Sequence, residues 1–187
     1  MGRCRVFQRY NLGVAYMTLY KNFADVPAAK WRWPNFQPSE IACRGTGKLL
    51  IDERAMDMLQ ELRTRLGKPV HINSGYRSPE HNRAVGGAKG SKHLEGIAFD
   101  CRMAGHDPQV FMATARDVGF KGIGEYPVLG FCHIDARLTA ASWTGSRGKR
   151  FPGTPATPVS AAHTIPRSAP SFWIQLIAAI MRLFKGK

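Results

Sequence analysis

The sequence SKHLEGIAFDCRM, residues 91–103, is the most informative segment for the fold, because it runs from a loop into a strand. Its first half is polar and its second half is rich in apolar residues, which predicts a strand from Gly96 to Met103. His93 and Asp100 bracket the passage, and His133 lies on another predicted strand. Two imidazoles and one carboxylate suit zinc, and three protein ligands leave a coordination position for water, as in catalytic zinc sites. The sequence therefore makes these three side chains candidate zinc ligands.

Helices and strands mix along the central part of the chain. Apolar residues recur at helical spacing in two segments, each preceded by an aspartate that can cap a helix. The expected helices cover residues 52–66 and 107–118, with a short helical turn near residue 39. The expected strands cover residues 70–74, 96–103, 122–126 and 130–136. Residues 79–92 are expected to be a loop that includes one helical turn. This mixture predicts an α+β domain, a small antiparallel sheet with flanking helices.

The composition changes sharply beyond the predicted domain, which we place at residues 36–143 after a lead-in of residues 1–35. Residues 144–170 are dense in Gly, Pro and Ser, which is typical of a flexible linker. Residues 171–187 have one broad apolar helical face and several cationic residues, which favours an amphipathic helix. At ~1.5 Å per residue such a helix is short for a bilayer core of ~30 Å, so we expect it to lie at a membrane surface. Docking of this helix onto the domain is the alternative.

The positive charge is concentrated at the C-terminal end. The formal net charge is +14, and eight Lys or Arg residues follow Asp135, the last acidic residue. Such a tail favours an anionic partner. The sequence contains no zinc-finger spacing, helix-turn-helix pattern or basic aromatic sheet motif, so we expect no specific nucleic-acid partner. The first residues lack an apolar stretch with a cleavage site, so we expect no secretory signal.

Several motifs resemble those of one known family. The sequence INSGYRSPEHN, residues 72–82, is similar to the SGYRS element of zinc D-Ala-D-Ala carboxypeptidases and related endopeptidases. Residues 91–100 resemble that family's S-x-H-x-x-G-x-A-x-D zinc element, and residues 122–127 with 131–135 resemble its closing strand pair. The resemblance extends over residues 36–135. It implies the fold of the lysostaphin, D-Ala-D-Ala peptidase and hedgehog group, an antiparallel sheet with zinc in its groove.

The resemblance also implies roles for individual residues. His93, Asp100 and His133 would bind the metal. Arg77 would bind a substrate carboxylate through its guanidinium, with Ser74 beside it or only shaping the loop. The alternative for Arg77 is a buried side chain that satisfies loop carbonyls.

The general base is where the sequence departs from the family pattern. Some relatives have Glu three residues before the last zinc histidine, and Gly130 occupies that position here. Asp135 lies two residues after His133, so strand alternation turns both side chains to one face. Glu125 lies on the preceding strand and can reach the site only if the pairing register allows. We prefer Asp135 as the base, with orientation of a ligand histidine as its alternative role.

The function implied is zinc-dependent hydrolysis of peptide bonds in bacterial peptidoglycan stem peptides or cross-links. We expect a phage-type endolysin, made in the cytoplasm without a signal peptide and acting on the cell wall after release. Its basic C-terminal tail would bind the anionic bacterial envelope or membrane surface. A D,D-carboxypeptidase that trims terminal D-Ala is one alternative. A non-catalytic, zinc-stabilised cell-wall binding module is the other.

Overall fold

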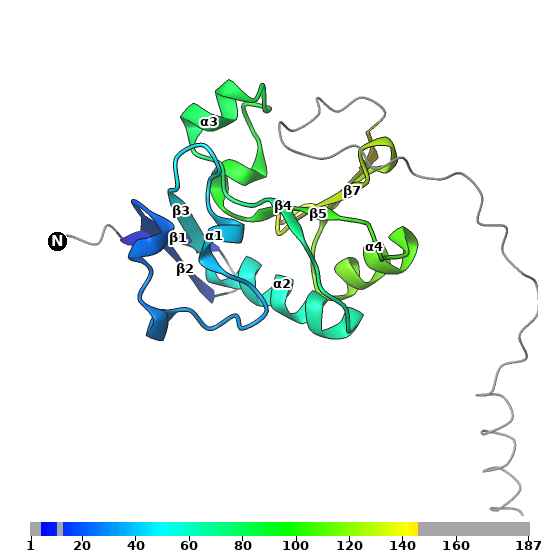
Figure 1. The fold of residues 1–187 in the computed structure, drawn as a ribbon, viewed down its shortest axis with the longest axis horizontal. Coiled ribbons are helices and arrows are strands. Elements are labelled where there is room, and N and C mark those ends of the chain that lie inside the picture. Colours follow the sequence, from blue (N-terminus) through cyan, green and yellow to red (C-terminus); the bar gives the residue numbers. More distant parts are fainter. Residues whose placement is uncertain (1–4, 11–12, 146–187) are drawn as a thin grey trace, which may run out of the picture. The chain divides into compact units, whose positions relative to one another are not determined.

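The computed structural model describes residues 5–10 and 13–145 (Figure 1). The predicted tail helix at 171–187 and residues 146–170 of the predicted linker lie outside the described residues. Among the described residues, no helix has both the length and the hydropathy needed to cross a membrane.

Two sheets form the framework. The first has three antiparallel strands in the order β1 (Arg5–Tyr10), β2 (Gly13–Tyr20) and β3 (Leu49–Asp52). The second has five strands in the order β4 (Ile72–Ser74), β5 (Ala98–Arg102), β7 (Phe131–Asp135), β6 (Gly122–Tyr126) and β8 (Ala141–Thr144). All neighbours in this second sheet are antiparallel except β6 and β8, which are parallel.

In the described part of the chain, four α-helices accompany the sheets: α1 (Pro38–Ile41), α2 (Glu53–Leu66), α3 (Pro79–Ala84) and α4 (Pro108–Asp117). Short 3-10 helices cover Phe23–Asp25, Ala28–Lys30, Lys92–Glu95 and Pro127–Leu129. The two long helices begin where the sequence predicts. The carboxylate of Asp52 accepts the amide N–H of Ala55, and that of Asp107 accepts the N–H of Gln109 and of Val110. These caps satisfy amides that have no partner within the helix.

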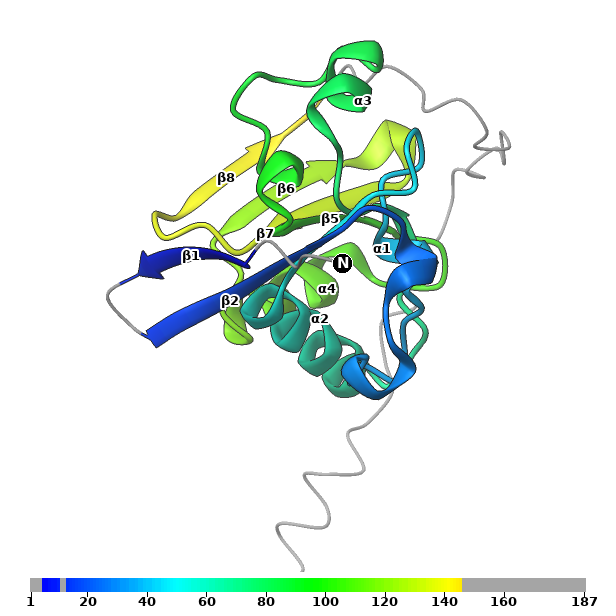
Figure 2. The same cartoon turned by 90° about the vertical axis from the view of Figure 1, so that its left-hand side faces the viewer.

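The hydrophobic core lies on one side of the five-stranded sheet. Helices α2 and α4 are on that side, and α3 is on the other (Figure 2). Buried residues of α2, such as Leu59 and Leu62, belong to the same cluster as Phe99 of β5 and Ile134 of β7. Since alternate residues of a strand face opposite sides, the neighbours of these core residues face away from α2 and α4. That second face carries Asp100 and His133.

The N-terminal segment differs from the expected lead-in. Residues 1–35 include β1 and β2, and β2 pairs with β3 from Tyr20↔Leu49 to Met17↔Asp52. The described residues therefore form two sheets, whereas the sequence predicted a single sheet. β8 was also not expected. It runs parallel to β6 because the chain reverses after β7 and then pairs with the far edge of β6.

Candidate metal centre

Three side chains converge on the face of the five-stranded sheet that is turned away from α2 and α4. Nε2 of His93 lies 3.2 Å from Oδ1 of Asp100 and 3.2 Å from Nδ1 of His133. Nδ1 of His133 lies 2.8 Å from the same Asp100 oxygen. All three residues are buried. The structure therefore brings the three predicted metal ligands together, with one nitrogen or oxygen of each at a common point.

Strand register explains this convergence. Asp100 of β5 and His133 of β7 are directly paired, so their side chains leave the sheet on the same face. His93 arrives from outside the sheet, on the 3-10 helix that ends at Gly96 with φ 71°. Its carbonyl accepts the backbone N–H of Arg77 at 3.0 Å, which ties the helix to the segment after β4.

Each candidate ligand is held by a second contact on its other polar atom. Nδ1 of His93 lies 2.7 Å from the Gly75 carbonyl, and Nε2 of His133 lies 3.1 Å from Oδ2 of Asp135. Oδ2 of Asp100 accepts a hydrogen bond from Nη2 of Arg77 at 2.7 Å. When Nδ1–H of His93 donates to the carbonyl, Nε2 keeps its lone pair and faces the other two ligands. Such outer contacts fix the tautomer and orientation of metal-binding side chains.

The arrangement fits zinc. Ligand atoms at ~2.0–2.1 Å in a tetrahedral zinc site are about 3.3 Å apart, and here they are 2.8 to 3.2 Å apart. Burial raises the pKa of Asp100, but His93 and His133 outweigh burial and hold that pKa well below its usual range. Burial lowers the pKa of His93. The site therefore offers an ionised carboxylate and a neutral imidazole, the forms that bind a metal ion.

Asp135 is placed to hold His133 rather than to face a substrate. Its side chain is fully buried, and besides His133 it accepts Nε and Nη2 of Arg137 at 2.7 and 2.6 Å. Burial raises its pKa, but the hydrogen bonds from His133 and Arg137 bring that pKa well below its usual range. A carboxylate so enclosed is a weak base. The contacts favour the alternative role, orientation of a ligand histidine.

Glu125 does not face the cluster. In the pairing of β6 with β7, Gly124 lies opposite His133 and Glu125 lies opposite Cys132. Because paired residues share a face of the sheet, the Glu125 side chain leaves on the Cys132 side. This register does not support our expectation that Glu125 can reach across to act as the base.

Arg77 connects Ser74 to Asp100. Nε of Arg77 donates to Oγ of Ser74 at 2.9 Å, while Nη2 of Arg77 pairs with the Asp100 carboxylate. The Arg77 side chain is almost entirely buried. The structure thus assigns these side chains a contact that the sequence did not indicate, and their binding of substrate stays a prediction.

Trp143 is a neighbour of the cluster that sequence reasoning missed. It pairs with Gly124, and its ring centroid lies 5.4 Å from that of His133. A Cβ at Gly124 would lie 2.4 Å from the indole, so only glycine leaves room for this ring. Nε1 of Trp143 donates to the Tyr126 hydroxyl at 2.9 Å. Glycine in a strand, here at both 122 and 124, is the signal of such a close approach.

Arg137 is a second neighbour that the sequence did not reveal, because it was grouped with the basic tail. Its guanidinium pairs with Asp135 and also lies 5.3 Å from the ring centroid of Trp143. Cys101 and Cys132 lie on the opposite face of the sheet from the cluster. They are paired across β5 and β7, are fully buried in the core and are free thiols. Burial raises the pKa of Cys132 to about 12.

This chain is similar to two peptidoglycan endopeptidases and to a zinc carboxypeptidase. Over 92 residues it is 38% identical to the peptidoglycan L,D-endopeptidase MepK of Escherichia coli strain K12, covering 46% of this chain and 50% of the relative. Over 103 residues it is 29% identical to the probable peptidoglycan L,D-endopeptidase MepK of Haemophilus influenzae, covering 51% and 55%. Over 66 residues it is 38% identical to the zinc D-Ala-D-Ala carboxypeptidase of Streptomyces albus G, covering 35% and 26%. The chain thus spans about half the length of the MepK relatives it matches.

The family match covers the whole candidate centre. The family described as Peptidase M15 matches residues 34–135, more than half of the chain, and this range contains the three candidate ligands and Asp135. The chain belongs to the peptidase M15 family.

Proposed function

We propose that this protein is a zinc metallopeptidase that hydrolyses peptide bonds in bacterial peptidoglycan, within the stem peptides or their cross-links. The observation that carries the proposal is the convergence of His93, Asp100 and His133, each held by a second contact. The names of the relatives, peptidoglycan endopeptidases and a zinc carboxypeptidase, support the substrate class.

The chain's own side chains would prepare the site. Zinc bound there would polarise a peptide carbonyl and lower the pKa of a bound water. Arg77 holds the second oxygen of Asp100, and Asp135 holds Nε2 of His133. Together with the Gly75 carbonyl on His93, these contacts fix all three side chains before a metal arrives. Binding then needs little rearrangement.

Digestion of purified sacculi tests the proposal. Zinc-loaded protein should release fragments, and the same protein stripped by a chelator should release none until zinc is restored. Mass spectrometry of the products identifies the bond that was cut. Undiminished digestion after chelation would refute a zinc-dependent reaction.

The same products separate endopeptidase from D,D-carboxypeptidase. Release of D-Ala from a pentapeptide would indicate the carboxypeptidase, and cleavage of cross-linked muropeptides the endopeptidase. The sequence argument for a carboxypeptidase was that Arg77 would bind a free terminal carboxylate. Since Arg77 is paired with Asp100, that argument is weaker, and we favour the endopeptidase.

A zinc-stabilised wall-binding module is the second candidate. One observation favours it: Asp135 is enclosed by Arg137 and His133, and Glu125 lies on the opposite face. Protein that retains zinc and binds sacculi but releases no fragments would establish this module and exclude the peptidase.

We further propose a phage-type endolysin that reaches the wall after release from the cytoplasm. The support is the basic sequence of residues 146–187, which suits the anionic envelope. A shortened chain ending at residue 145 should digest purified sacculi as well as the full chain does, but lyse intact cells less. Equal lysis of cells by both would exclude a targeting role of the tail.

A further inference from the structure

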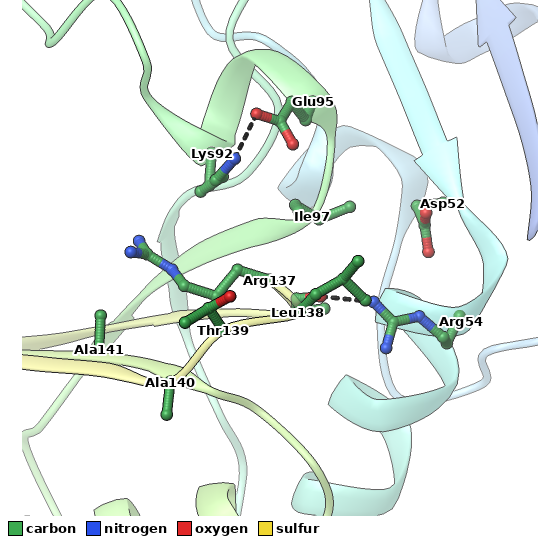
Figure 3. Close-up of a pocket in the computed structure, with 11 residues that line it drawn as sticks. Asp52, Arg54, Lys92, Glu95, Ile97, Arg137, Leu138, Thr139, Ala140 and Ala141 are labelled. Atoms are coloured by element: carbon green, nitrogen blue, oxygen red, sulfur yellow. Dashed lines mark hydrogen bonds and ion pairs between the residues drawn. The ribbon is translucent and has the colours of Figure 1, made fainter. Parts of the chain in front are cut away.

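A pocket of about 410 Å³ is lined in part by neighbours of the residues that form the candidate metal centre (Figure 3). It lies between the 3-10 helix Lys92–Glu95, the first turn of α2 and the chain that follows β7. Two of its lining residues are related to the metal cluster, one through the sequence and one through a chain of contacts. Lys92 immediately precedes His93, and Arg137 holds the carboxylate of Asp135, the partner of His133. These two residues link the pocket wall to the candidate metal centre.

The pocket is lined by cationic side chains from three separate elements. These are Arg54 of α2, Lys92 of the 3-10 helix and Arg137 after β7. Arg54 also donates to the Ala136 carbonyl, which holds its guanidinium at the pocket wall (Figure 3). Arg137 is already paired with Asp135, so Arg54 and Lys92 are the cations that favour an anionic ligand here.

The two acidic lining residues do not cancel this charge. Asp52 is only 1% exposed and caps α2 through the N–H of Ala55, and burial raises its pKa. Glu95 pairs with Lys92 at 2.6 Å, with side chains that are 41% and 29% exposed. Solvent-exposed pairs of this kind are weak, so an incoming carboxylate can replace Glu95 as the partner of Lys92.

Apart from Thr139, the remaining lining residues are apolar. Ile97 and Leu138 lie between the cationic groups, and Ala140 and Ala141 lie at the far side (Figure 3). An apolar floor with cations around it complements an aliphatic chain that ends in an anionic group. A bare inorganic anion would make no contact with these apolar side chains.

We propose that this pocket is a substrate subsite for a peptide residue whose aliphatic side chain ends in a carboxylate, with Lys92 as the principal cation. This proposal rests on the proposed function, because it takes the ligand to be part of a wall peptide. In this proposal the pocket selects among peptides and takes no part in bond cleavage.

Two synthetic stem peptides, identical except that one side-chain carboxylate is a carboxamide in the second, test the proposal. Binding of each to the full-length, zinc-loaded protein is measured by calorimetry, and cleavage is followed in parallel. We expect the acid form to bind about tenfold more tightly, the effect of one charge-assisted hydrogen bond. Lys92→Met should remove most of this preference while zinc content is unchanged.

Lys48→Met is the matched control. Lys48 also forms a half-exposed ion pair, with Glu80 at 2.8 Å, and it does not line the pocket. This variant loses the same charge and a similar pair, so it should keep the tenfold preference. If Lys92→Met loses zinc, Arg54→Gln replaces it as the test and should also reduce the preference.

The outcomes separate the two proposals. Equal binding of both peptides by the unaltered protein would overturn the subsite, while their cleavage would leave the proposed function standing. Preference for the acid that Lys92→Met abolishes would support the subsite even without cleavage, and the absence of cleavage would then count against the peptidase alone.

Discussion

Nε2 of His133 lies 3.1 Å from Oδ2 of Asp135, at the end of β7 where both side chains share one face of the sheet. Nδ1 of the same ring faces Asp100 and His93. With the proton on Nε2 donated to Asp135, the lone pair of Nδ1 is directed at the cluster. Asp135 thereby determines which nitrogen of His133 can bind a metal.

Asp135→Asn should therefore weaken zinc binding by about 10- to 100-fold, the usual effect of losing an outer partner of a metal ligand. Competition with a chromogenic chelator measures the affinity. Asp117→Asn, an exposed aspartate on α4, is the control and should bind zinc normally. Unchanged zinc affinity together with lost hydrolysis would instead make Asp135 the general base.

Arg77→Met should also lower zinc affinity, by about tenfold or more, because Oδ2 of Asp100 loses its cationic partner. Arg77→Lys keeps the charge but not the fork that reaches Ser74 and Asp100 together, so it should recover only part of the affinity. A rise in KM with unaltered zinc binding would show that Arg77 contacts substrate.

Gly124→Ala should destabilise the fold by about 1–3 kcal/mol, since the new methyl group would overlap the indole of Trp143. Urea unfolding measures the change in the free energy of unfolding. Gly90→Ala, where a Cβ meets nothing within 4 Å, should have little effect.

The double variant Gly124→Ala, Trp143→Ala makes the test specific. Removal of the indole opens the space, so the two changes together should cost less than the sum of their separate effects. Strict additivity would mean that the ring does not lie over Gly124.

The pH dependence of zinc binding should follow His133. Burial works against the charged ring, but hydrogen bonds to Asp100 and Asp135 raise its pKa to about 9 in the metal-free protein. Zinc needs the lone pair of Nδ1 and must displace this proton. Its affinity should therefore rise by up to ~10-fold per pH unit from pH 6.5 to 9 and then level off.

The stability of the metal-free protein should change in the opposite direction. A raised pKa means that His133 contributes stability fully below its unfolded pKa of about 6.5, and that this contribution is lost as pH rises through 9. Unfolding of chelated protein across this range measures it. His133→Gln should flatten both profiles, and a zinc affinity independent of pH in the unaltered protein would contradict the assignment.

Much of the local structure and the ligand set could be predicted from sequence. Periodicity and capping aspartates indicated α2 and α4, because both signals are local along the chain. The strand β6 was predicted with its observed bounds, and β7 within one residue at each end. His93, Asp100 and His133 could be proposed as ligands because their residue types suit zinc and because the surrounding motifs resemble those of a zinc peptidase family.

The identity of each side chain's partner depended on the tertiary structure. Alternation could place Asp135 on the face of His133, but only the β6–β7 register shows that Glu125 leaves on the other face. Pairing of β8 with β6 brings Trp143 over Gly124, and no local pattern marks residues 141–144 as a neighbour of that strand.

The role of Arg137 could not be predicted from sequence either. Its sequence neighbours suggest a basic tail, but its side chain contacts Asp135 and Trp143. The pocket lined by Arg54, Lys92 and Arg137 likewise joins three segments distant in sequence. The sequence alone indicated α2, α4, the strands β4 to β7 and the side chains that can bind a metal, because periodicity, capping and ligand chemistry are properties of short segments. The tertiary structure decided register, strand order and charge pairing, because these arise from contacts between segments that close only when the chain folds.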